Sequence, residues 1–198
     1  MEWQKLNNNN IVNPFPPYIF KFHYDFEWER IKDKVYKTFE TVPNVSELER
    51  GDSHSTLFDQ GTPPHKWPEL AEYFQWLHGP LSQVWNSMNY NWYAKQTNYQ
   101  NSWFNIHRNS GETLEHQHAY TELVITSYLQ LPKDSGYIEF RDPLEYHKAH
   151  TPIRHEEELW KEVPCATGDI LIFPGWLKHR VQPNKTDLDR IVMTVNVA

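Results

Sequence analysis

Two stretches of the first ninety residues carry apolar positions at helical spacing. The first runs from Asp25 to about Thr41, with Asp25 in the place of an N-cap residue. The second runs from Pro68 to about Met88, and Gly79-Pro80 interrupts it, so we expect a kink or two helices there. We expect both stripes to pack into the core. The apolar positions that define them are Phe26, Ile31, Val35 and Phe39, then Leu70, Phe74, Leu77, Leu81, Val84 and Met88.

After residue 90 the pattern changes to short β-type segments separated by turn signals. Eight or so strands in about a hundred residues predict a sandwich or barrel of the jelly-roll type, mainly β with flanking helices. We expect a single domain over 1–198, in which 1–90 supplies an N-terminal strand and supporting helices and 91–198 the β core. The charged stretch Asp142–Leu159 is expected to be a long loop. The expected strands are Tyr18–Tyr24, Trp92–Thr97, Ser102–His107, Leu114–Tyr120, Glu122–Leu131, Tyr137–Arg141, Trp160–Pro164, Asp169–Phe173, Leu177–Gln182 and Asp189–Val197.

Composition narrows the classes of protein that fit this pattern. The 198 residues carry a net charge of −7, which argues against a nucleic-acid partner or an anionic membrane surface. The single cysteine, Cys165, excludes an internal disulfide framework and a cysteine-rich zinc site. No apolar run approaches the roughly 18 residues of a membrane helix, and the N-terminus lacks a signal core. We therefore expect a cytoplasmic protein, and a homodimer is one assembly that the sequence allows.

Three histidines stand at spacings that suit a metal site. His116 and His118 are two residues apart, so on a strand they point to the same face. His179 follows a short apolar strand and a Pro-Gly-Trp turn. Two ligands from one strand and a third from a distant strand give the facial arrangement of non-haem iron. A surface pair and a structural histidine are the alternatives, and His107 is expected to be structural unless its strand brings it to the site.

An arginine makes the histidine pattern more specific. Arg190 begins the most strand-like stretch of the chain, eleven residues after His179. A buried arginine is costly unless it pairs with an anion, and a carboxylate bound beside a metal would satisfy it. With a period of two, Val192, Thr194 and Asn196 share its face, and two of these can form hydrogen bonds to a small ligand.

The order of these motifs resembles the 2-oxoglutarate- and Fe(II)-dependent oxygenases. The chain shows H-x-H, then G-D-I-L-I-F-P-G-W-L-K-H-R-V-Q-P, then R-I-V-M-T-V-N, over roughly 100–198. It most closely resembles the small prolyl-hydroxylase-like branch found in phages and marine bacteria. Three shorter pieces support the resemblance: Trp103-Phe-Asn105, Tyr128-Leu and Pro174-Gly-Trp176.

The resemblance implies a double-stranded β-helix, a cupin-like barrel, that holds Fe(II) and the cosubstrate 2-oxoglutarate. It implies hydroxylation of a C–H bond with O₂, coupled to conversion of 2-oxoglutarate into succinate and CO₂. By similarity, His116 and His179 bind iron and Arg190 binds the distal carboxylate of 2-oxoglutarate. The further cosubstrate contacts that it implies are Asn105, Ser127, Tyr128, Val181 and Thr194; Ser127 and Tyr128 stand where related enzymes often carry two tyrosines.

One position departs from the superfamily pattern. The superfamily has Asp or Glu two residues after the first histidine, where this chain has His118. Three imidazoles could bind the iron, a carboxylate such as Glu122 could substitute, or the position could be vacant. We favour His118, because strand alternation aims it toward the site.

Two other classes of protein fit parts of the pattern. A cupin-type dioxygenase with three histidines would not use 2-oxoglutarate, and it leaves Arg190 unexplained. A non-catalytic metal-containing barrel could recognise carbohydrate or peptide through its aromatic surface. The substrate cannot be read from the sequence; a peptidyl proline and a free amino acid are guesses by analogy, and fold does not fix substrate.

Overall fold

A computed structural model describes residues 19–44, 46–59, 61–88, 97–144 and 159–198. Its strands form a six-stranded and a five-stranded sheet, and every strand pairing is antiparallel. In order, the larger sheet contains β1 (Phe20–His23), β9 (Asp169–Pro174), β6 (Leu123–Gln130), β11 (Arg190–Val197), β4 (Tyr99–His107) and β3 (Ser53–Ser55). The smaller contains β2 (Glu49–Arg50), β5 (Glu112–His116), β10 (His179–Val181), β7 (Ile138–Arg141) and β8 (Trp160–Val163).

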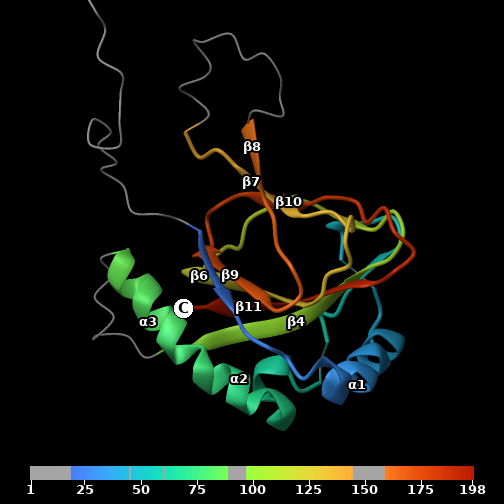
Figure 1. Cartoon of the computed structure of the whole chain (residues 1–198), viewed down its shortest axis with the longest axis horizontal. Coiled ribbons are helices and arrows are strands. Elements are labelled where there is room, and N and C mark those ends of the chain that lie inside the picture. Colours follow the sequence, from blue (N-terminus) through green and yellow to red (C-terminus); the bar gives the residue numbers. More distant parts are fainter. Residues whose placement is uncertain (1–18, 45, 60, 89–96, 145–158) are drawn as a thin grey trace, which may run out of the picture.

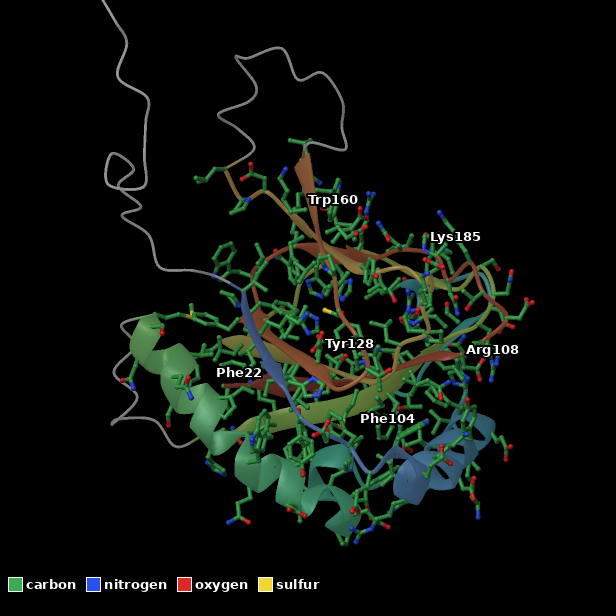
Figure 2. The ribbon with its side chains drawn as sticks, viewed as in Figure 1. Phe22, Phe104, Arg108, Tyr128, Trp160 and Lys185 are labelled. Atoms are coloured by element: carbon green, nitrogen blue, oxygen red, sulfur yellow. The ribbon has the colours of Figure 1, made fainter. Side chains whose placement is uncertain are left out.

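The two sheets face each other as a jelly roll, which is the double-stranded β-helix expected from the resemblance (Figure 1). From β4 to β7, and again from β8 to β11, consecutive strands lie in different sheets: β4 and β6 belong to the larger sheet, and β5 lies between them in sequence but in the smaller one. This alternation encloses a space between the sheets. Figure 2 shows Tyr128 in that space, whereas Phe104 lies on the side of the helices.

Helices cover the outer face of the larger sheet (Figure 1). In α1, Ile31, Val35 and Phe39 recur every four residues and are buried in one cluster with the outward side chains of β11 and β6. The helices and single 3₁₀ turns are α1 (Trp28–Thr41), η2 (Pro64–Lys66), η3 (Pro68–Leu70), α2 (Ala71–Trp76) and α3 (His78–Ser87). None of the helices in the described ranges is long and apolar enough to cross a membrane.

The expected elements differ from the observed ones in a few places. Helix α1 begins at Trp28, so Asp25 is not its N-cap; Glu27 is, without a side-chain hydrogen bond. The break in the second helical stretch lies at Leu77 rather than at Gly79-Pro80, because Pro80 is tolerated in the first turn of α3.

The first half of the chain also contributes strands to the barrel. β2 and β3, which the sequence pattern did not predict, extend the edges of the two sheets, and β1 pairs with β9. Part of the expected strand Trp92–Thr97 and most of the expected loop Asp142–Leu159 lie outside the described residues. The assignment of the chain to a single domain stays a prediction.

Candidate metal centre

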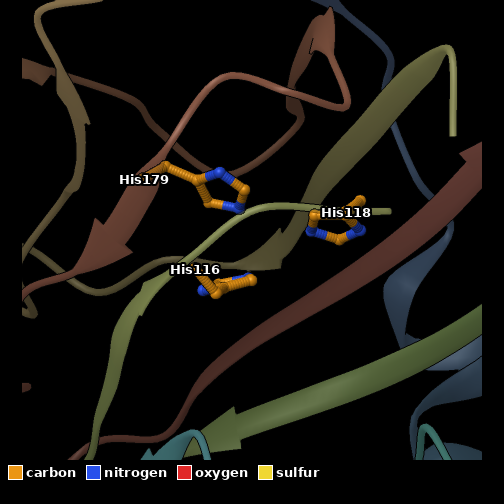
Figure 3. A group of neighbouring side chains, drawn as sticks. All are labelled: His116, His118 and His179. Carbon is orange, nitrogen blue, oxygen red and sulfur yellow. The ribbon is translucent and has the colours of Figure 1, made fainter. Parts of the chain in front are cut away.

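Two of the three histidines are placed by strand pairing. His116 is the last residue of β5 and His179 the first of β10, and the antiparallel register sets them directly opposite each other. Side chains of paired residues point to the same face of a sheet, so both imidazoles enter the space between the sheets (Figure 3). Their ring centroids are 4.3 Å apart.

His118 reaches the same point from a turn rather than from a strand. Strand β5 ends at His116, so the expectation that alternation along a strand would aim His118 is wrong in its reason. Instead, the backbone N–H of His118 donates to the carbonyl of Gly175 at 2.8 Å. Gly175 leaves no room for a Cβ, which would lie 2.2 Å from the carbonyl oxygen of Thr121. The His118 ring lies 5.2 Å from each of the other two rings and stacks on Trp103.

Hydrogen bonds set the same tautomer in all three imidazoles. Each Nδ1 lies against an oxygen acceptor: the Leu114 carbonyl for His116 at 2.8 Å, the Leu177 carbonyl for His179 at 2.9 Å, and Asn196 Oδ1 for His118 at 2.7 Å. Because a carbonyl oxygen can only accept, each Nδ1 carries the proton and each Nε2 keeps its lone pair.

The three free lone pairs converge. One ligand atom from each histidine lies within 4.8 Å of the other two, and His118 Nε2 is buried without a hydrogen-bond partner in the described residues. A buried polar atom without a partner is rare in native proteins and calls for an explanation, such as an ion. A metal-binding histidine usually donates its other ring N–H to an oxygen acceptor, as these three do. The side chains therefore fit a divalent metal ion.

Burial keeps the centre uncharged when no metal is bound. It lowers the pKa of His118 to about 4, with the nearby His116 as a smaller cause, and lowers the pKa of His179 well below its ordinary value. Burial also lowers the pKa of His116. Neutral imidazole is the form that binds metal, so no proton has to leave at neutral pH. Glu122 is not part of this group, nor does it line the adjoining cavity.

A cavity of about 250 Å³ adjoins the three histidines between the two sheets. Four of the predicted cosubstrate contacts line it: Asn105, Tyr128, Val181 and Thr194. Asn105 Nδ2 donates to Thr194 Oγ1 at 3.3 Å, which joins β4 to β11 across the cavity wall. Ligand sites are typically about 300–1,000 Å³, so this space suits a small molecule.

The structure does not bring Ser127 to the cavity. Side chains alternate along β6, and Ser127 points to the helix side, where its hydroxyl forms a 2.6 Å hydrogen bond with the hydroxyl of Tyr73. Thr126 and Tyr128, its neighbours in sequence, line the cavity instead. The expectation that Ser127 contacts the cosubstrate is therefore wrong, because the wrong face of the strand was assigned to it.

Arg190 lies at the far end of β11, on the face of the strand that turns toward the cavity. It is completely buried, and it lies just behind the cavity wall rather than on its surface. Its Nη1 and Nη2 donate to the backbone carbonyls of Ser135 and Gln182, and its Nε has no hydrogen-bond partner in the described residues. A guanidinium has five N–H groups, so donors remain for an anion.

Sequence reasoning missed a polar cluster at this end of the cavity. Glu49, His107 and Thr113 all line it and bond to one another. His107 was expected to be structural unless its strand approached the site, and the pairing of β4 with β11 sets it opposite Arg190. No motif marks Glu49, because it lies in a two-residue strand of the unpatterned segment between the helices. Asn196, the acceptor for His118, was expected only as a ligand contact.

Comparison with known proteins agrees with this geometry. Residues 101–196 match a family model described as a putative 2OG-Fe(II) oxygenase. No curated protein matches the chain in sequence. The matched segment begins in β4 and ends in β11, and it contains all three histidines and Arg190.

Solved structures with the same fold include three such enzymes. A prolyl-4-hydroxylase from Pseudomonas putida is 9% identical with a TM-score of 0.57, over 90% of this chain and 91% of that chain. HygX from Streptomyces hygroscopicus, with nickel, 2-oxoglutarate and hygromycin B bound, is 14% identical with a TM-score of 0.61, over 91% and 82%. The viral collagen prolyl hydroxylase of Paramecium Bursaria Chlorella virus-1 is 12% identical with a TM-score of 0.57, over 91% and 96%.

Residues 101–196, the segment that carries the candidate site, match the 2-oxoglutarate- and Fe(II)-dependent oxygenase superfamily. The predicted superfamily and the double-stranded β-helix are thereby confirmed, and the cofactors of this superfamily are Fe(II) and 2-oxoglutarate. The narrower assignment to a branch found in phages and marine bacteria stays a prediction.

Proposed function

We propose that this oxygenase is a hydroxylase whose iron is held by His116, His118 and His179. The observation that carries the proposal is the convergence of three Nε2 lone pairs within 4.8 Å, each imidazole being fixed by an oxygen acceptor on Nδ1. With protein ligands on one face only, an Fe(II) ion keeps open positions toward the cavity, the arrangement typical of non-haem iron oxygenases.

The cavity suits 2-oxoglutarate because its two ends differ in chemistry. The histidines stand at one end, where a bound metal would take the keto acid group. Arg190 stands behind the other end with an unpartnered Nε–H, which suits the distal carboxylate. Tyr128, Val181 and Thr194 lie along the walls between these ends. The polarity of the cosubstrate thus matches the order of the side chains.

The reaction that follows has a simple balance. One oxygen atom of O₂ goes to succinate as 2-oxoglutarate loses CO₂, and the other goes into a C–H bond of the substrate. The metal, when bound, supplies the activation of O₂, and the chain fixes the ligands, keeps water out and positions the substrate. A small molecule or a peptide is the expected substrate class, because proteins of similar fold include one with hygromycin B bound and a collagen prolyl hydroxylase.

The test is an anaerobic titration of the protein with Fe(II) and then with 2-oxoglutarate. We expect a weak visible charge-transfer band when both are bound, and O₂-dependent formation of succinate when air is admitted. His179→Ala should remove both signals, because it takes away one of three ligands. His78→Ala is the matched control, since His78 is exposed on α3 and should leave both signals unchanged.

The alternatives give different results in the same titration. A cupin-type dioxygenase would bind iron but form neither the band nor succinate. A non-catalytic barrel would bind a metal such as Zn²⁺ without any O₂-dependent product. Arg190 favours the oxygenase over both, because a fully buried arginine with spare donors beside the cavity has no role in either.

A further inference from the structure

Glu49 places a carboxylate inside the cavity. Its side chain is only 4% exposed, although β2 is a two-residue strand at the edge of the smaller sheet. The pairing of β2 with β5 sets Glu49 directly opposite Thr113, three residues before the first histidine of the centre. Because the pairing of β5 with β10 shifts register between Thr113 and His116, both of these residues face inward, and Glu49 lines the same cavity as the metal centre.

Two neutral side chains lie within hydrogen-bond reach of this carboxylate. His107 Nε2 lies 2.7 Å from Thr113 Oγ1, and that hydroxyl lies 3.1 Å from Glu49 Oε2. If the hydroxyl accepts from the imidazole, its own proton goes to Glu49, and His107 Nε2 also lies 3.3 Å from Oε2. In this arrangement both groups donate to the carboxylate, which accepts through its oxygens.

No cation of the described residues pairs directly with Glu49. Its one ion-pair distance is to His107, where burial and the nearby Arg190 charge lower the imidazole pKa and keep the ring neutral. Arg190 gives both of its terminal nitrogens to backbone carbonyls. Burial lowers the pKa of Arg190 and of His116, and the nearby Glu49 carboxylate opposes that lowering in both, so its charge acts on each of them. A buried charge without a direct partner is costly unless a charge nearby compensates it.

The charges of the proposed complex show what Glu49 compensates. In superfamily members with two histidines and one carboxylate, Fe(II) contributes two positive charges and the arginine contributes one. The carboxylate and the 2-oxoglutarate dianion balance these charges. With His118 in place of the carboxylate, one positive charge is left over. We propose that Glu49 supplies this missing negative charge from outside the ligand set. The inference rests on the proposed function and adds a residue that tunes its centre.

The same count argues against a second role for Glu49, which is recognition of a cationic group on the substrate. If Glu49 carries its charge, the metal, the arginine and the cosubstrate already balance, so a substrate cation would leave the cavity positively charged. Its place beside Thr113 and His107 also puts the carboxylate within the cavity wall that we assign to the cosubstrate. Glu49 is therefore a positioning residue that acts on the centre through its charge.

The experiment compares Glu49→Gln with Glu47→Gln by calorimetry. Glu47 is exposed two residues away, so its variant removes one charge from the same segment outside the cavity. Two affinities are measured without turnover: that of Ni(II) for the metal-free protein, and that of 2-oxoglutarate for the Ni(II)-loaded protein. In Glu49→Gln we expect Ni(II) to bind about tenfold more weakly and 2-oxoglutarate several-fold more tightly. Glu47→Gln should match the unmodified protein in both.

The opposite signs of the two effects separate a charge effect from damage to the site. Loss of both affinities in Glu49→Gln would mean that Glu49 only holds the wall in shape, and it would overturn the inference. So would two unchanged affinities, because Glu49 would then be uncharged in the folded protein. Both of these results leave the proposed function standing. If the unmodified protein binds neither Ni(II) nor 2-oxoglutarate, the proposed function fails first and the inference falls with it.

Discussion

The two faces of the larger sheet are buried to a similar degree but carry different chemistry. On β11, Ile191, Met193 and Val195 are completely buried against the helices. On the opposite face, Val192 and Thr194 are each 6% exposed and line the cavity. Burial alone therefore does not distinguish the core from the site. On β11 the distinction lies in polarity, because along this strand only the cavity face carries side chains that can form hydrogen bonds.

This difference separates stability from function along a single strand. An outward side chain acts through buried apolar area and close packing, and neither depends on a ligand. An inward side chain acts through donors and acceptors arranged for something that is not protein. We therefore expect substitutions on the helix face to lower stability without changing affinity, and substitutions on the cavity face to do the reverse.

The largest effect should come from Arg190, which faces the cavity but should contribute to stability as well as to affinity. Arg190→Ala removes the N–H groups that donate to two backbone carbonyls. It also removes the buried cation whose charge interacts with that of Glu49. Taking away one partner of buried polar and charged groups costs about 3–5 kcal/mol. We expect a loss of that size in the free energy of unfolding, measured with urea, together with loss of 2-oxoglutarate binding.

Arg180 provides the control for Arg190. Its guanidinium is paired with Glu139 and lies over Trp160, but the side chain is 42% exposed. Arg180→Ala should cost less than about 1 kcal/mol, as exposed ion pairs do. Equal losses in the two variants would show that the buried position of Arg190 carries no special cost.

The next effect tests the helix face alone. Met193 is completely buried among the apolar side chains of that face. Met193→Ala should cost about 2–5 kcal/mol through lost apolar contact and a cavity. Ni(II) affinity, measured on the folded variant, should be unchanged. Thr194→Val, one residue along on the cavity face, should change stability little and weaken 2-oxoglutarate binding. A reversed result in either variant would contradict the separation of the two faces.

The pH dependence of the metal-free protein comes from the cavity face. Burial lowers the pKa of His118 to about 4, against an ordinary pKa of 6.5. Between these values the unfolded chain binds a proton that the folded chain does not, so stability falls as the pH falls. The full contribution of the lowered His118 pKa to the free energy of unfolding is about 3 kcal/mol. Urea unfolding at pH 7 and pH 4.5 should show a larger loss of stability in the unmodified protein than in His118→Asn. His78→Asn should leave the slope unchanged.

The sequence predicted the elements whose period is local. The outward stripe of α1 and the alternation in β11 are visible in the chain because one face of each is uniformly apolar. His116 and His179 could be found for the same reason, since each stands at the end of a strand beside a turn. The sequence did not predict that the strands of His116 and His179 pair directly opposite each other, because that register joins segments far apart in the chain.

The errors arise where geometry depends on partners far away in sequence. Ser127 was assigned to the wrong face because every residue of β6 up to Leu129 is buried, which hides the alternation. Glu49 escaped notice because two residues are too short for any period, and β2 exists only through its pairing with β5. His118 was correctly brought to the site for a wrong reason, since a backbone contact with Gly175 holds it there.

The smallest effect that we predict concerns the tautomer of His118. Asn196 Oδ1 accepts the Nδ1 proton of His118 at 2.7 Å, and Asn196 stands on the cavity face of β11. Asn196→Leu removes the acceptor, so the ring is no longer fixed with Nε2 toward the other two histidines. Loss of such an outer contact costs about 10–100-fold in metal affinity. We expect that loss for Ni(II) in calorimetry, with the free energy of unfolding nearly unchanged. Asn196→Asp keeps an acceptor and should restore the affinity. If it binds as weakly as the leucine variant, the acceptor is not what orients His118, and packing on Trp103 has that role.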